Sequence, residues 1–205
     1  MSKALLIIDL QNDFLENGAL AVPKSNEIIP IINEVARAFN LVLASFDWHP
    51  KNHISFASTW GKKPGEVHNG QILWPNHCIQ NSTGAQFPET FNRNVVDRVF
   101  YKGFKENVDS YSIFIDQNRM PASESYSFLQ AKGIEELYIA GLATDYCVLA
   151  SVLDALLLGY KVTVISDACR AVNVQDHDES KAISKMKDRG ALFISSDEVL
   201  KTHLL

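Results

Sequence analysis

The stretch Leu137-Tyr-Ile139-Ala-Gly-Leu-Ala-Thr-Asp-Tyr-Cys147-Val148 connects an expected strand to an expected helix. Residues 137–140 are a short run of apolar, β-branched and aromatic side chains, which is typical of a buried strand. Residues 148–158 carry apolar side chains at helical spacing, and Gly159 follows where a helix would stop. Thr144 or Asp145 is the expected N-cap. The pattern therefore places Cys147 in the first turn of a helix, at the carboxyl end of a strand.

This position predicts an activated thiol. Unpaired backbone N–H groups and the positive end of the helix dipole converge on the first turn of a helix. We therefore expect Cys147 to have a depressed pKa and an elevated thiolate fraction. The alternative is an inert, buried Cys147, because free cysteines are usually buried.

Strands and helices alternate along the rest of the chain. Further strands are expected at residues 4–10, 41–46, 98–101, 161–166 and 191–195, and helices at 25–40, 124–131 and 176–189, with a short terminal helix. Each strand is nearly continuous in apolar residues, which indicates a mostly parallel sheet covered on both faces. The sequence thus predicts one three-layer α/β/α domain over residues 1–205, with about six strands.

Composition excludes several classes of protein. The chain has 205 residues, 46% of them hydrophobic and 21% charged, as expected for one soluble domain. The net charge of −5 and the lack of a basic cluster argue against a nucleic-acid partner. Neither a membrane-spanning segment nor a signal peptide is recognisable. Three cysteines suggest reduced thiols in the cytoplasm. Whether the chain forms a homo-oligomer stays open.

Polar residues follow the expected strands. Asp9, Asp47, Lys102 and Cys147 all lie at or just beyond strand carboxyl ends, where parallel sheets hold their sites. Asp9 can act as the base for the thiol and later as the acid for a leaving amine, while Lys102 supplies positive charge. Backbone N–H groups of Ala143 and Cys147 are candidates for an oxyanion hole. Alternatively, Asp9 caps a turn and Lys102 is a solvated lysine.

A second group of residues suits a metal ion. Asp47 and His49, two residues apart on an extended strand end, point to the same side. A third ligand from His53, His68 or His77 would complete a two-histidine, one-carboxylate site with open positions, which suits zinc, manganese or ferrous iron. The irregular segment 48–90 that supplies these histidines is long for a compact domain, as functional loops often are.

Taken together, the motifs resemble the nicotinamidase/pyrazinamidase branch of the isochorismatase-like cysteine hydrolases, and the match covers essentially the whole chain. Four stretches carry it: Ile8-Asp9-Leu-Gln-Asn-Asp-Phe14; Asp47-Trp-His49-Pro with His53-Ile-Ser-Phe56; Leu73-Trp74-Pro-Asn-His77-Cys78; and Phe100-Tyr-Lys102-Gly with Gly141-Leu-Ala-Thr-Asp-Tyr-Cys147-Val. The acidic, lysine and cysteine motifs occur across the superfamily. The Asp-x-His motif with the later Trp-Pro-x-His-Cys is more specific to nicotinamidases.

The resemblance implies an amidase that hydrolyses nicotinamide to nicotinate and ammonia in NAD salvage, with pyrazinamide as an alternative substrate. It implies that the metal anchors the pyridine nitrogen and so places the carboxamide carbon over the thiol. The residues implied are a triad of Asp9, Lys102 and Cys147, a metal site of Asp47, His49 and His77, and ring-flanking Phe14 and Trp74.

The resemblance leaves alternatives at several other residues. Phe14 and Trp74 could equally be core aromatics, and His53 matches a histidine that binds metal in only some members. Family members carry a cis peptide in the nucleophile turn, here between Leu142 and Ala143. The loop over residues 105–121 matches no clear template.

Two other functions stay open at this point. One is an amidase or carbamoyl hydrolase of the same fold that acts on another small substrate, and relatives of that kind generally lack the metal motif. The other is a non-catalytic ligand-binding module that retains the motifs without the activity.

Overall fold

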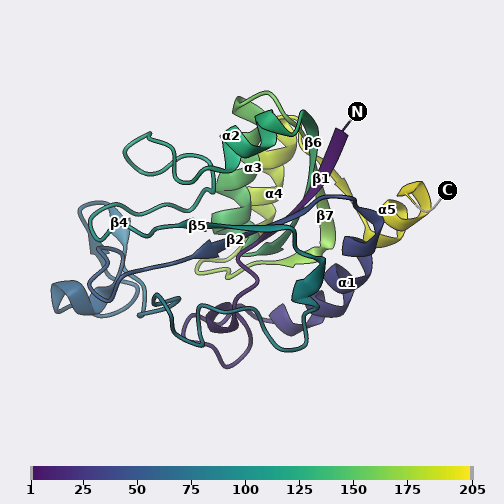
Figure 1. Cartoon of the computed structure of the whole chain (residues 1–205). Helices are drawn as coiled ribbons and strands as arrows, with labels where there is room; N and C mark the ends of the chain where they lie inside the picture. Colours follow the sequence, from purple (N-terminus) through teal and green to yellow (C-terminus); the bar gives the residue numbers. More distant parts are fainter. Residues whose placement is uncertain (1, 204–205) are drawn as a thin grey trace.

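A computed structural model describes residues 2–203, and its core is a sheet of six strands in the order β5-β2-β1-β6-β7-β8 (Figure 1). All five strand pairs are parallel. The strands are β1 (Ser2–Ile8), β2 (Val42–Asp47), β5 (Arg98–Lys102), β6 (Ile134–Leu142), β7 (Lys161–Arg170) and β8 (Leu192–Ile194). The predicted α/β fold with a parallel six-stranded sheet is confirmed.

Helices cover both faces of this sheet. Helices α2 (Ser125–Ala131), α3 (Leu149–Leu157) and α4 (Asp178–Asp188) lie on one face, and α1 (Ile28–Val35) and α5 (Ser196–His203) lie on the other (Figure 1). Alternate residues of β1 supply the two cores, because successive strand side chains point to opposite faces. Leu5 and Ile7 pack with α1, whereas Leu6 and Ile8 pack on the opposite side with α3 and α4.

The helix expected at residues 25–40 is shorter than predicted. Helix α1 is flanked by 3-10 turns at Ser25–Glu27 and Ala36–Ala38, and no side chain caps its N-terminus. Its apolar residues Ile28, Ile29, Ile32 and Val35 are buried, so the expected apolar face is present. The pattern therefore located the helix correctly but not its ends.

The expected N-cap in the Cys147 turn is wrong. Ala143 is the cap residue, without a side-chain cap bond, and a π-helical turn (Thr144–Val148) precedes α3. The carboxylate of Asp145 instead accepts hydrogen bonds from the backbone N–H groups of Val172 and Asn173, at 3.0 and 2.8 Å. Asp145 thus binds the segment after β7 rather than its own helix.

Two long segments lie beyond the carboxyl ends of β2 and β5. Residues 48–97 contain only short turns and an antiparallel hairpin of β3 (Val67–His68) and β4 (Gln71–Ile72). Residues 103–124 have no strand or helix. Among residues 2–203, no helix combines the length and apolar character needed to cross a membrane. The irregular segments pack over one end of the sheet, where the polar residues gather.

Gly141 gives a test of the packing between β1 and β6. It has φ +121°, and an added Cβ would lie 2.0 Å from the carbonyl oxygen of Ile8. We expect Gly141→Ala to lower the free energy of unfolding by about 3 kcal/mol or more, from backbone strain and overpacking. Urea unfolding at equilibrium measures this change.

Gly133→Ala is the matched control for this measurement. Gly133 also has a positive φ, +63°, but no other atom lies within 4 Å of the place that an added Cβ would occupy. Its substitution therefore incurs only the strain of the left-handed backbone, about 1–2 kcal/mol. Equal losses in the two variants would contradict the close approach of β6 to β1.

Candidate active site

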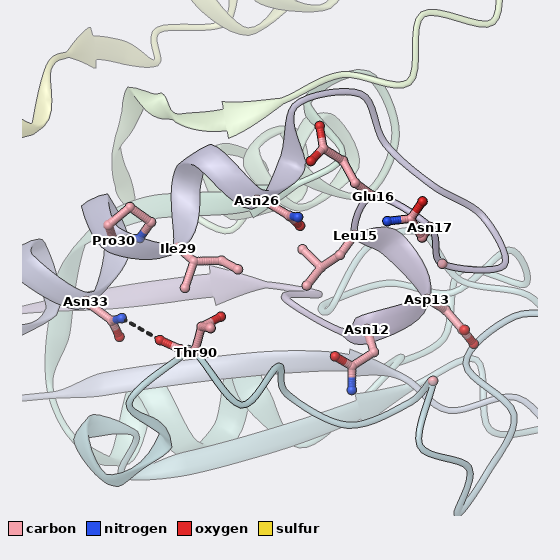
Figure 2. A pocket seen from close by; sticks show the side chains of 12 residues that line it. Asn12, Asp13, Leu15, Glu16, Asn17, Asn26, Ile29, Pro30, Asn33 and Thr90 are labelled. Atoms are coloured by element: carbon pink, nitrogen blue, oxygen red, sulfur yellow. Dashed lines mark hydrogen bonds between the residues drawn. The ribbon is translucent and has the colours of Figure 1, made fainter.

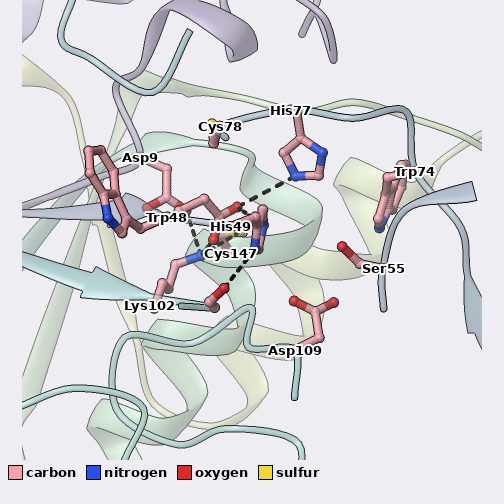
Figure 3. A network of polar contacts seen from close by, with 12 residues as sticks. Asp9, Trp48, His49, Ser55, Trp74, His77, Cys78, Lys102, Asp109 and Cys147 are labelled. Atoms are coloured by element: carbon pink, nitrogen blue, oxygen red, sulfur yellow. Dashed lines mark hydrogen bonds and ion pairs between the residues drawn. The ribbon is translucent and has the colours of Figure 1, made fainter. Parts of the chain in front are cut away.

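Lys102, at the end of β5, lies fully buried between two carboxylates (Figure 3). Its Nζ is 2.9 Å from Oδ2 of Asp9 and 2.5 Å from Oδ1 of Asp47. The same Nζ is 3.4 Å from Sγ of Cys147. The parallel register pairs Asp47 with Lys102, while Asp9 and Cys147 follow the ends of β1 and β6. The structure therefore brings together the three residues predicted as a triad.

The charges in this cluster stabilise one another. Burial alone would lower the pKa of Lys102, but the carboxylates of Asp47 and Asp9 hold it well above its usual value. Burial alone would raise the pKa of Asp47, but Lys102 and His49 hold it well below its usual value. Lys102 is thus an ammonium group and Asp47 a carboxylate at neutral pH.

The pKa values of Asp9 and Cys147 shift in the opposite direction from that of Asp47. Burial raises the pKa of Asp9 although Lys102 opposes the shift, and Ser45 donates a hydrogen bond of 2.6 Å to its Oδ1. Burial likewise raises the pKa of Cys147 well above its usual value, and Lys102 only partly offsets this. The predicted depressed pKa of Cys147 is therefore wrong for the metal-free protein, because desolvation of the sulfur outweighs the nearby cation.

The turn that carries Cys147 closes tightly after β6. The peptide bond between Leu142 and Ala143 is cis, as the resemblance implied. The carbonyl of Ala143 accepts hydrogen bonds from the N–H groups of Tyr146 and Val148, each at 3.1 Å. Ala143 and Cys147 both line the same small pocket, so their backbones border the space in front of the sulfur.

Asp47, His49 and His77 form a cluster that can hold a metal ion. Oδ2 of Asp47 is 3.6 Å from Nε2 of His49 and 3.8 Å from Nε2 of His77. The Nδ1 atoms of the two histidines lie 2.9 Å from the Gly103 carbonyl and 2.8 Å from the Pro75 carbonyl. Because a carbonyl only accepts, each Nδ1 must donate, which leaves Nε2 to bind a cation.

This donor set fits a divalent cation. Two imidazole nitrogens and one carboxylate oxygen suit zinc, manganese or ferrous iron. Burial, with the neighbouring His49, lowers the pKa of His77 to about 4, so His77 is neutral at pH 7. Oδ1 of Asp47 faces Lys102, which leaves Oδ2 for the cation.

The structure does not bring His53 or His68 into this cluster. The ring of His53 stacks on His49 with centroids 4.1 Å apart, and its Nδ1 and Nε2 lie 2.7 Å from Ser55 Oγ and 3.2 Å from the Val108 carbonyl. His53 groups instead with His49 and Asp109. His68 lies in β3 of the hairpin, and its ring packs against Trp60.

A small pocket connects the thiol to Asp47 and His77, two of the three possible metal ligands. Phe14 and Trp74, the predicted ring-flanking residues, are both in its wall. The full lining is Phe14, Leu20, Asp47, Trp74, His77, Tyr111, Ala143, Tyr146, Cys147 and Val172. One planar molecule in this pocket would therefore face both the sulfur and the metal cluster.

Sequence reasoning missed two aromatic residues of this pocket. Tyr111 accepts a hydrogen bond of 3.0 Å from the indole nitrogen of Trp74, and the rings of Trp74 and Tyr146 are 5.0 Å apart. Tyr146 adjoins Cys147 in sequence, which was the available signal. Tyr111 belongs to the loop without a template, so no pattern marked it.

A wider groove lies beside α1 and contains none of the predicted catalytic or metal-binding residues (Figure 2). Its Asn12 and Asn33 side chains donate to backbone carbonyls of Thr83 and Thr90, at 2.8 and 3.0 Å. Both side-chain amides therefore hold separate segments of the chain together. The smaller pocket, which borders Cys147, Asp47 and His77, is the candidate active site.

Comparisons with known proteins show the family to which the chain is related. The isochorismatase domain family matches residues 3–198. A nicotinamidase of Escherichia coli is 46% identical, with 92% of each chain covered. A solved nicotinamidase and pyrazinamidase of Acinetobacter baumanii has a TM-score of 0.92 and 38% identity, covering 97% of this chain and 98% of that one. A pyrazinamidase of Pyrococcus horikoshii in complex with zinc has a TM-score of 0.77 and 34% identity, covering 95% and 99%.

The raised pKa of Cys147 predicts how its reactivity depends on pH. In metal-free protein, the rate of alkylation by iodoacetamide should keep rising beyond the usual thiol pKa of about 8.5, because only the thiolate reacts. Mass spectrometry of the Cys147 peptide after reaction at a series of pH values would measure the rate. A plateau at neutral pH would instead mean a depressed pKa.

Proposed function

The chain belongs to the isochorismatase family, and we propose that it is a nicotinamidase that hydrolyses nicotinamide to nicotinate and ammonia. The observation that carries the proposal is that Cys147, Asp47 and His77 all border one small pocket. The similarity to the nicotinamidase of Escherichia coli supports the same activity. Pyrazinamide, which also has a ring nitrogen and a carboxamide, is the expected alternative substrate.

The pocket suits one aromatic ring. Phe14 and Trp74 would pack against the ring, while Cys147 would face the carboxamide carbon. Asp47, His49 and His77 would hold one divalent cation, with zinc favoured by the donor set and by the zinc-bound relative. When bound, this cation would supply a Lewis acid for the ring nitrogen.

Asp9 and Cys147 would carry out the first half of the reaction. Asp9 takes the proton of the thiol as the sulfur attacks the carboxamide carbon. The negative oxygen that forms would be stabilised by the backbone N–H groups of Ala143 and Cys147. Asp9 then gives its proton to the nitrogen, the C–N bond breaks, and ammonia leaves behind a thioester.

Water completes the reaction at the same residues. Asp9 removes a proton from water, and the hydroxide oxygen attacks the thioester carbon. The C–S bond breaks, nicotinate is released, and the sulfur recovers the proton from Asp9. Lys102 remains charged throughout and stabilises Asp9 while Asp9 is a carboxylate. Because all three cysteines are free thiols, we propose that the enzyme works in the cytoplasm.

Removing the nucleophile tests the proposed chemistry. Cys147→Ala should lower ammonia release from nicotinamide and from pyrazinamide by at least about 10³-fold, because no thioester can form. Cys169→Ala, which removes another buried thiol, should retain activity. A coupled ammonia assay measures both variants. Purified protein that binds metal but releases no ammonia from nicotinamide would contradict the proposal.

Removing the carboxylate ligand tests the metal site. Asp47→Ala should lose the bound metal found by elemental analysis of the parent protein, because only two ligands remain. The variant should also bind nicotinate more weakly. A parent protein without metal, in which nicotinamide does not compete for the site, would favour an amidase for another substrate.

A further inference from the structure

Three polar residues between Asp9 and Phe14 have no role in the reaction described above. Gln11 is completely buried, and Asn12 and Asp13 belong to the 3-10 turn that follows it. In Figure 2 the side chains of Asn12 and Asp13 leave this turn in different directions. Their hydrogen bonds reach parts of the chain that are far apart in sequence.

The side-chain amide of Gln11 forms hydrogen bonds with both the N–H and the carbonyl group of Asp47. Its Oε1 accepts a hydrogen bond of 2.9 Å from the Asp47 N–H, and its Nε2 donates to the Asp47 carbonyl at 2.8 Å. The Nε2 group also donates to the Ala85 carbonyl at 3.0 Å. The amide therefore fixes the backbone of Asp47 where β2 ends.

Asp13 forms a hydrogen bond with the segment that carries His77, another possible metal ligand. Its Oδ2 accepts a hydrogen bond of 2.7 Å from the N–H of Cys78, the residue after His77. The carbonyl of Cys78 in turn accepts a hydrogen bond of 3.0 Å from the N–H of His49. Gly84 packs so closely that an added Cβ would lie 2.1 Å from Oδ2 of Asp13. The position of this carboxylate is therefore restricted.

We propose that Gln11 and Asp13 are positioning residues that set the distance between Asp47 and His77 for metal binding. The two ligands come from separate segments, and Gln11 and Asp13 bind one segment each from a single short stretch. A metal site needs its ligands held within about 0.5 Å of the productive geometry. This inference rests on the proposed metal site at Asp47, His49 and His77.

Zinc affinity provides the test, measured by competition with a chromophoric chelator. Gln11→Met and Asp13→Ala should each weaken zinc binding by about 10–100-fold, the usual effect of losing an outer-shell partner. Asp13→Asn keeps an acceptor for the Cys78 N–H and should recover much of the affinity. Asn12→Ala is the matched control, since Asn12 binds the Thr83 and Phe87 carbonyls instead, and should bind zinc normally.

Thermal unfolding of the metal-free variants separates positioning from general destabilisation. Gly84→Ala is a second test of the position of Asp13. The added methyl group displaces the Asp13 carboxylate, while every hydrogen-bonding group is kept. Folded Gln11→Met and Asp13→Ala proteins with the parent's zinc affinity would overturn the inference, as would an equal loss in Asn12→Ala. Ammonia release from nicotinamide by the parent protein is measured separately and tests the proposed function.

Discussion

The ion pairs of Lys102 with Asp9 and Asp47 are the interaction on which the site depends. One buried ammonium group contacts two carboxylates and lies 3.4 Å from the sulfur of Cys147. Removing one partner of a buried ion pair is strongly destabilising, because the other charge is left uncompensated. Lys102 thus joins the nucleophile and the metal-binding cluster into one electrostatic unit. This unit has two negative charges and only one positive charge, so it attracts a further cation to Asp47.

The parallel sheet explains why these residues meet. Strands β1, β2, β5 and β6 are neighbours and end at the same edge, so residues far apart in sequence converge. The pairing of Asp47 with Lys102 follows directly from the register of β2 and β5. The aromatic pocket then depends on the irregular segments that pack over this edge.

Much of the fold and site could be predicted because the signals are local. Apolar strands alternating with helices indicated the sheet, and Asp9, Asp47, Lys102 and Cys147 stood at strand ends. The pKa of Cys147 could not be predicted, because it depends on burial by distant segments. Tyr111 and the backbone contacts of Gln11 were also hidden, since they arise from loop packing without periodicity.

A crystal structure of the metal-loaded protein with bound nicotinate tests the central claim most directly. The distance from the Cys147 sulfur to the carboxyl carbon is the decisive measurement. We expect van der Waals contact between these atoms, with the ring between Phe14 and Trp74 and its nitrogen toward Asp47 and His77. Nicotinate bound in another place, or with its carboxyl group directed away from Cys147, would contradict the account.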